Sequence, residues 1–227
     1  DARALAAAAG RGAAALQALL DQGADIDVRL KDQAEAKHNG QTALHVAARA
    51  GDAAAARVLL ASGAEVNAQK GECTAPIYLA AQEGHTEVLK VLLAAGADPK
   101  QANNNGASPV YIAAQEGQTE ALKVLLAAGA DPEQAAQRGY TPVCIAAQNG
   151  QTEALQVLLA AGADPKQTAI NGASPVWIAA AEGQTDALKV LLAAGADPKQ
   201  AQNDGTTPVF IAAYNGHTEA LKVLLAA

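Results

Sequence analysis

The sequence predicts an all-α solenoid of stacked helix-turn-helix units with projecting turns, and three observations support this fold class. A near-identical segment recurs every 33 residues along almost the whole chain, which is typical of a repeat array. Alanine supplies 61 of the 227 residues, so small side chains are expected to let neighbouring helices pack closely. Aromatic residues make up only 3% of the chain, too few to fill one large globular core.

Each unit is predicted to begin with a turn and a short helix. The phrase ASPVYIAA and most of its counterparts place Thr or Ser directly before Pro, and these residues favour the N-cap and the first helical position. A glycine after each phrase marks the expected end of the helix, because glycine readily adopts the left-handed conformation there. The units start near a shared turn position, which is occupied by Gly40, Cys73, Gly106, Gly139, Gly172 and Gly205.

A second helix is predicted in segments such as TEALKVLLAAG, where Leu122, Val124, Leu125 and Leu126 form the apolar face. The polar stretches that follow, such as GADPKQANNNG, are too rich in Pro, Asn and Gly for a helix, so they are expected to project as turns. Neither helix can bury its apolar face alone, and the units must therefore stack. We expect residues 1–227 to form a single domain.

The N-terminal repeat, about residues 1–39, departs from this pattern. It lacks the Thr-Pro start but keeps the phrase AALQALLDQGAD, which predicts a degenerate or capping repeat. The distance from Gly23 to Gly63 is 40 residues, so a seven-residue insertion lies between Arg29 and His38 in the first projecting turn. This charged insertion is interpreted either as a solvated loop or as a contact for a specific partner.

The sequence resembles the ankyrin repeat family in its 33-residue period and in its unit of a turn plus two helices. The phrases TALH at 42–45 and TPVC at 141–144 also resemble the signature of that family. The resemblance covers essentially the whole chain in six in-register copies. It implies a left-handed stack whose concave face, built from first helices and projecting turns, holds other proteins.

The position of the family's signature histidine varies along the chain. Most of the residues at this position are aromatic. They are interpreted either as side chains that pack between repeats or as a strip that receives a ligand. The residues in this row are His45, Tyr78, Tyr111, Cys144, Trp177 and Phe210.

Charge and hydropathy exclude two classes of partner. The net charge is −7 and the pI is near 5.0, and Lys and Arg are spread singly along the sequence, so no nucleic-acid partner is expected. No apolar run reaches the roughly 18 residues of a membrane span, so no direct membrane insertion is expected and the protein is predicted to be soluble.

The two cysteines, Cys73 and Cys144, fall two repeats apart. They are too distant to bridge if each repeat advances roughly 10 Å, which predicts free thiols and a reducing, intracellular compartment. Cys73 also replaces a turn glycine, so we expect a local irregularity there. The chain starts at Asp1, which is compatible with a removed targeting segment or a longer parent.

The sequence offers no convincing catalytic, cofactor or metal site. The pattern GRG at 10–12 coincides with a turn between helices and follows no strand, so dinucleotide binding is not expected. His85 and His217 open second helices without the spacing of a zinc site. Cys144 lies two repeats from either histidine and lacks a base. The chain is therefore predicted to be no enzyme and to need no cofactor.

Partner contacts are implied by the resemblance at the helix ends before the closing glycines, just after the turn glycines, and at the turn tips. These positions vary between copies while the packing positions hardly change, which suits recognition but is also compatible with drift of an unconstrained surface. The candidate contact residues are Gln115, Glu116, Arg138, Tyr140, Gln148, Asn149, Ile170, Glu182, Tyr214 and Asn215.

Two functional hypotheses follow. The first is a non-enzymatic scaffold that binds a partner protein through the concave face and turn tips, with Tyr140 and Tyr214 as the best anchors. The second is a structural spacer that bridges components of a larger assembly through its ends or edges. The last unit repeats the internal phrase without polar replacements, so we expect it to be the least stable unit and to be covered by more repeats or by a partner.

Overall fold

The computed structural model describes residues 2–9, 13–29, 40–72 and 74–227. In these residues the regular structure is helical throughout, with one isolated bridge between Lys70 and Thr74. The elements in chain order are α1 (Ala2–Ala9), α2 (Ala13–Asp21), α3 (Ala43–Ala50), α4 (Ala53–Ala61), α5 (Pro76–Gln82), α6 (Thr86–Ala94), α7 (Pro109–Gln115), α8 (Thr119–Ala127), the 3₁₀ helix η2 (Gln137–Gly139), α9 (Pro142–Gln148), α10 (Thr152–Ala160), α11 (Pro175–Ala181), α12 (Thr185–Ala193), α13 (Pro208–Tyr214) and α14 (Thr218–Leu225).

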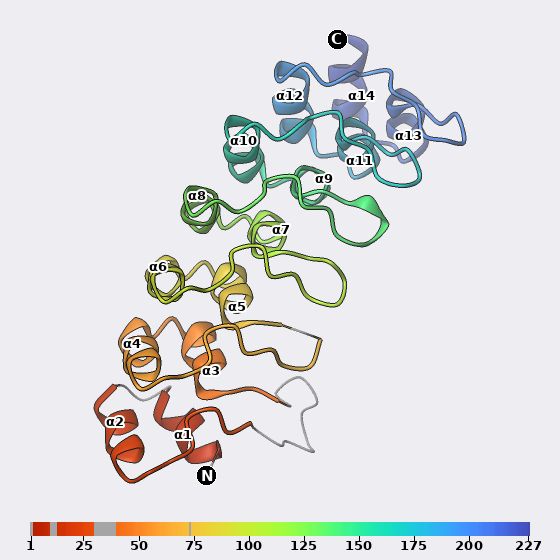
Figure 1. The fold of residues 1–227 in the computed structure, drawn as a ribbon. Helices are drawn as coiled ribbons and strands as arrows, with labels where there is room; N and C mark the ends of the chain where they lie inside the picture. The colour runs from red at the N-terminus through yellow and green to blue at the C-terminus, as the bar shows by residue number, and fades with distance from the viewer. Residues whose placement is uncertain (1, 10–12, 30–39, 73) are drawn as a thin grey trace.

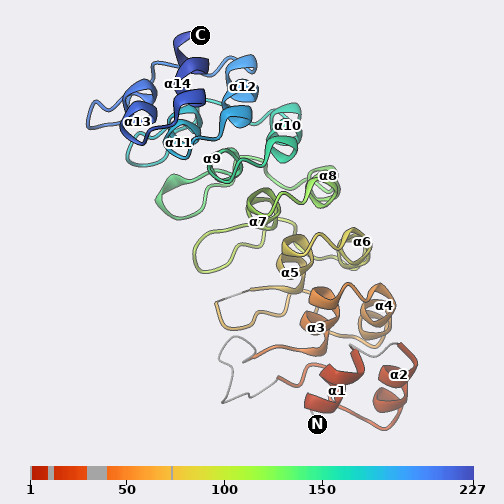
Figure 2. The same ribbon diagram turned by 180° about the vertical axis from the view of Figure 1, so that it is seen from behind.

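The helices form two layers that run the length of an elongated stack, and the projecting turns extend from one side of it (Figure 1). Odd-numbered helices make the inner layer next to the turns, and even-numbered helices make the outer layer, as the view from behind also shows (Figure 2). Each helix packs against its partner in the pair and against the matching helix of the next pair. The predicted all-α solenoid of helix-turn-helix units is confirmed.

The inner helices begin where the sequence predicts. The Ser108 hydroxyl accepts a hydrogen bond from the backbone N–H of Tyr111 at 3.2 Å, and the Thr141 hydroxyl accepts one from Cys144 at the same distance. A proline occupies the first turn of both helices, where its missing N–H costs no hydrogen bond. The N-cap residue and the proline together fix the start of each inner helix.

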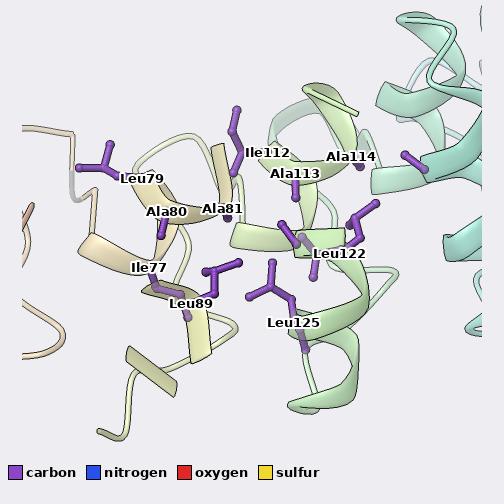
Figure 3. Close-up of a cluster of buried hydrophobic side chains, with 14 of the residues drawn as sticks. Ile77, Leu79, Ala80, Ala81, Leu89, Ile112, Ala113, Ala114, Leu122 and Leu125 are labelled. Atoms are coloured by element: carbon purple, nitrogen blue, oxygen red, sulfur yellow. The ribbon is translucent and has the colours of Figure 1, made fainter. Parts of the chain in front are cut away.

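The core is a continuous layer of leucine and alanine between the two sets of helices. Leu89, Leu122 and Leu125 have no exposed surface, and Figure 3 shows them gathered with the side chains of α5 and α7 between the helices. Ala113 and Ala114 lie among them on α7, fully buried, and their small side chains permit the close approach of neighbouring inner helices. Every pair therefore buries its apolar face against the next.

The projecting turns lie at residues 65–72, 98–108, 131–141, 164–174 and 197–207. Single backbone hydrogen bonds join neighbouring turns near their tips. The bonds run from Asn104 N to Glu72 O, Gln137 N to Asn105 O, Ile170 N to Arg138 O and Asn203 N to Asn171 O, at 2.8 to 3.1 Å. The regular spacing of these bonds extends the order of the helices into the turns, so the turns form a second wall beside the inner helices.

Two sequence-based expectations fall outside the described residues. The insertion between Arg29 and His38 occupies most of the segment 30–39, and the local irregularity was expected at Cys73. The assignment of the whole chain to one domain, with a degenerate repeat at about 1–39, remains a prediction.

Candidate functional site

The inner helices α3, α5, α7, α9, α11 and α13 lie next to the projecting turns along the stack (Figures 1 and 2). We call the surface that these helices share with the adjoining turns the groove. Between α5, α7 and two neighbouring turns the groove deepens into a cavity of about 380 Å³. Its lining is rich in amides and contains two tyrosines; the residues are Tyr78, Gln82, Asn103, Asn105, Ala107, Tyr111, Ile112, Gln115, Ala136 and Gln137.

Tyr78 and Tyr111 give the cavity its hydrogen-bonding character. The pKa of each phenol is raised to about 12, mainly by burial; Tyr111, Glu116 and Glu72 contribute to this rise at Tyr78. Both hydroxyls therefore stay protonated at neutral pH, where each can donate and accept a hydrogen bond. Together with the amide side chains they form a lining that presents both donors and acceptors.

The side chains at the position of the signature histidine mainly pack inside the stack. His45 and Cys144 are completely buried, and Trp177 is half-buried and donates from its indole nitrogen to the Thr206 carbonyl at 3.1 Å. The packing interpretation is confirmed for these three residues. Phe210 differs, because 57% of its surface is exposed.

The candidate contact residues all lie on the groove side of the stack. They belong to the ends of inner helices, to the projecting turns or to residues adjacent to these elements. Glu116, Arg138, Asn149, Ile170, Glu182, Tyr214 and Asn215 are exposed, whereas Gln115, Tyr140 and Gln148 are half-buried. Gln115 is the member of this set that lines the cavity. That these residues contact a partner remains a prediction.

Asn149 and Asn215 have a structural task that the sequence reasoning missed. The Asn149 side-chain nitrogen donates to the Gln115 carbonyl at 3.1 Å, and that of Asn215 donates to the Ala181 carbonyl at 2.8 Å. Each amide thus adds a hydrogen bond to a carbonyl at the end of the preceding inner helix. The same two carbonyls also accept from the side chains of Gln151 and His217, respectively. The separation of 34 residues in both pairs is close to the repeat period and is the signal that could have identified them.

The two tyrosines predicted as anchors differ in their surroundings. Tyr140 packs against a small buried cluster that includes Cys144 and Ala169, so its ring contributes to the stack. Tyr214 is 78% exposed, and its ring stacks on Phe210 with 6.1 Å between ring centroids and an interplanar angle of 11°. Tyr214 therefore offers more apolar surface to a partner than Tyr140 does.

Cys144, which the sequence analysis considered as a nucleophile, is enclosed in the stack. Burial raises the pKa of the Cys144 thiol, and the thiol points to the Gln167 carbonyl at 3.7 Å. In the same residues no group of three His, Cys, Asp or Glu side chains is arranged to hold a metal ion. The described helices also include none that is long and apolar enough to cross a bilayer.

Comparison with known proteins identifies the family. The family model for ankyrin repeats matches residues 1–70, 77–169 and 143–227, so the chain belongs to the ankyrin repeat family. The crystal structure of the human ASB11 ankyrin repeat domain is similar, with 26% sequence identity and a TM-score of 0.87 over 98% of this chain and 96% of that chain. Among curated proteins none matches the sequence. The ankyrin repeat fold is generally a protein-protein interaction module, and proteins that contain it are typically non-enzymatic.

Proposed function

We propose that this chain is a non-enzymatic scaffold that holds a segment of a partner protein in the groove. The observation that supports this most strongly is the cavity between α5 and α7, whose walls come from two inner helices and two turns. A concave surface with a few convergent polar groups is a common form of binding site.

The chemistry of the lining favours a polypeptide in an extended conformation. Neutral tyrosine hydroxyls and the amides of Gln82 and Gln115 can pair with the N–H and C=O groups that an extended main chain leaves free. The rings of Tyr78 and Tyr111 add rigid apolar area, which is a frequent source of binding energy at interfaces. The partner is therefore recognised by its main chain at the cavity and by its side chains elsewhere along the groove.

The spacer hypothesis has one observation in its favour. Phe210, Tyr214 and Leu225, all on α13 and α14, expose 57%, 78% and 70% of their surfaces. Exposed apolar groups gathered on one helix pair favour contact with another protein. In this alternative the partner would dock on α13 and α14, and the central cavity would stay empty.

Selection from a library of displayed random peptides distinguishes the two functions. Peptides recovered on the unaltered protein should bind a Gln82→Lys, Gln115→Lys double variant at least about tenfold more weakly, because the new charges occupy the cavity. Gln156→Lys is the matched control, since Gln156 is exposed on the outer helix α10 and the equivalent positions 90, 123 and 189 already carry lysine. Equal binding to all three proteins, with loss on Phe210→Ser, would contradict the groove and support the spacer.

A further inference from the structure

Asparagine is followed directly by glycine at four places in the described residues. These steps begin at Asn105, Asn149, Asn171 and Asn215, which are all exposed; a fifth step, at 39–40, begins outside the described residues. Asparagine is a thermolabile residue. It is most labile before glycine, because the missing Cβ lets the following backbone nitrogen approach the side-chain amide carbon. Since all four asparagines are exposed, only the restraint of their side chains can rank their reactivity.

The side chains of three of these asparagines are held by hydrogen bonds. The amides of Asn149 and Asn215 donate to backbone carbonyls of the preceding repeat at 3.1 and 2.8 Å. The side-chain oxygen of Asn171 accepts from the backbone N–H of Ala173 at 3.2 Å. Each of these bonds must break before the side chain can turn toward the nitrogen of the following glycine.

Asn105 is the exception, and the cause lies two residues earlier in the same turn. The side-chain oxygen of Asn103 accepts from the backbone N–H groups of both Asn105 and Ala107, at 2.9 and 3.0 Å. The N–H group of Ala107 is therefore occupied by Asn103. The Asn105 side chain makes no hydrogen bond with any other described residue.

The other turns show what Asn103 prevents. At the positions equivalent to Asn105, the side chains of Asn171 and Asp204 each accept from the backbone N–H two residues further on. The positions equivalent to Asn103 are 136, 169 and 202, and they carry Ala, Ala and Gln. Asparagine at 103 thus frees the side chain at 105 from the bond that its counterparts make.

The nitrogen that would attack is restrained alike at the two turn tips that carry asparagine. The backbone N–H of Gly106 donates to the Asn103 carbonyl, and that of Gly172 donates to the Ala169 carbonyl, both at 2.9 Å. Asn105 and Asn171 therefore form a matched pair, because they differ in the restraint of the side chain and not in that of the nitrogen.

We propose that Asn105 is a site of spontaneous deamidation that reacts ahead of the other three steps. The backbone nitrogen of Gly106 gives up its proton and forms a bond with Cγ of Asn105, the bond from Cγ to the side-chain nitrogen breaks, and ammonia leaves with that proton. Water then adds to either carbonyl carbon of the cyclic imide and opens the ring. The products are aspartate and isoaspartate, and no atom is oxidised or reduced.

Both products alter the wall of the cavity, because Asn103 and Asn105 line it. A carboxylate replaces a neutral amide. Isoaspartate also lengthens the main chain by one carbon, next to the carbonyl that accepts from Gln137 N at 2.8 Å. Asp204 stands at the equivalent position, so the fold accommodates the aspartyl product. The modification itself does not depend on the proposed groove function.

The test follows the folded protein during incubation in a mildly alkaline buffer. Peptide mapping by mass spectrometry, with chromatographic separation of the aspartyl and isoaspartyl peptides, gives a rate for each step. Asn105 should convert about tenfold faster than Asn171, which is the rate equivalent of one restraining hydrogen bond. In denaturant these bonds are lost and the two rates should agree. Equal rates in the folded protein, or the same ratio in denaturant, would overturn the inference.

Asn103→Ala supplies the sharper test, and the equivalent positions 136 and 169 already carry alanine. The substitution releases the Ala107 N–H to the Asn105 side chain and should slow conversion there about tenfold. Asn171 in the same variant is the internal reference, and its rate should not change. Asn105→Arg, with the residue found at 138, should abolish the fastest release of ammonia. An unchanged rate at Asn105 in Asn103→Ala, with Asn171 also unchanged, would overturn the inference.

Discussion

The indole nitrogen of Trp177 donates a hydrogen bond to the carbonyl oxygen of Thr206, 29 residues further along the chain, at 3.1 Å. The Nε2 atom of His45 likewise donates a hydrogen bond to the carbonyl oxygen of Thr74, which is also 29 residues further along the chain, at 3.0 Å. In both pairs a side chain of one inner helix reaches the end of the following turn. The signature position therefore ties each turn to the repeat before it when its side chain has a nitrogen donor.

Trp177→Phe should lower the free energy of unfolding by about 0.5 to 1.5 kcal/mol, the net value of one hydrogen bond. The loss stays near this range because the Thr206 carbonyl also accepts from Gln202 N and is not left without a partner. Urea denaturation of the variant measures the change. Tyr214→Phe is the control, since Tyr214 is 78% exposed, and an equal loss in both variants would contradict the role of this bond.

His45 should make the stability of the fold depend on pH. Burial is the main reason why its pKa falls to about 4 from an ordinary value of 6.5, and the ring also accepts from the Thr42 backbone N–H at 3.1 Å through Nδ1. The folded state therefore keeps the ring neutral where the unfolded state binds a proton. The stabilisation is complete above pH 6.5 and is lost as the pH falls toward 4, by on the order of 3 kcal/mol.

Denaturation curves of the unaltered protein and of His45→Gln, recorded between pH 7 and pH 4, check this dependence. Subtracting one series from the other removes the effect of all other titrating groups. The difference should be constant above pH 6.5 and shrink below it. A difference that stays constant down to pH 4 would show that His45 titrates alike in both states.

The leucine core should be sensitive to truncation at any central repeat. Leu122→Ala removes a side chain with no exposed surface and should cost about 2 to 5 kcal/mol of stability. Leu225→Ala, at a leucine that is 70% exposed, should cost much less. Thermal and chemical denaturation of the two variants measure the contrast, and similar losses would be inconsistent with a core shared between α7 and α8.

Cys144 should react slowly with thiol reagents in the folded protein. Its side chain is completely buried, and burial also raises the thiol pKa, so the reactive thiolate is scarce and enclosed. The measurement uses a Cys73→Gly background, because the other units carry glycine at that turn position. Labelling should accelerate sharply in denaturant; rapid labelling of the folded protein would contradict the burial of Cys144.

The substitutions Tyr214→Ser and Tyr140→Ser should differ in their effect on stability. Tyr214 is exposed and stacks only on Phe210 among the aromatic rings of the described residues, so its loss should spare stability and weaken groove-bound peptides by about 1 to 2 kcal/mol if they reach α13. Tyr140→Ser should also lower stability, since the ring packs against Cys144 and Ala169. Calorimetric titration and denaturation of both variants separate the two effects.

The helix positions could be predicted because each has a local signal in the sequence. Ser108 and the following proline define the start of α7 without reference to any distant residue. The half-buried state of Tyr140 and the Asn149 bond to Gln115 could not be predicted in the same way. Both depend on which residue of the neighbouring repeat faces them, and the register of stacking decides that.

The contact between Arg29 and Gln69 is another feature that no local sequence pattern predicts. The two residues are 40 positions apart, in successive turns. Only the stacking of one projecting turn on another brings Arg29 to the Gln69 carbonyl. The inner surface was implied by the family resemblance, whereas the contacts between successive turns follow from the three-dimensional arrangement.

Site-specific photo-crosslinking shows whether a partner segment lies in the groove. A photoreactive residue is placed at Gln115, which lines the cavity between α5 and α7, or at Gln156 on the outer side of α10. Each protein is irradiated with the peptide that binds the unaltered protein most tightly. A segment bound in the groove should give a crosslinked product from position 115 and none from position 156. Crosslinking from position 156 with none from position 115 would contradict binding in the groove.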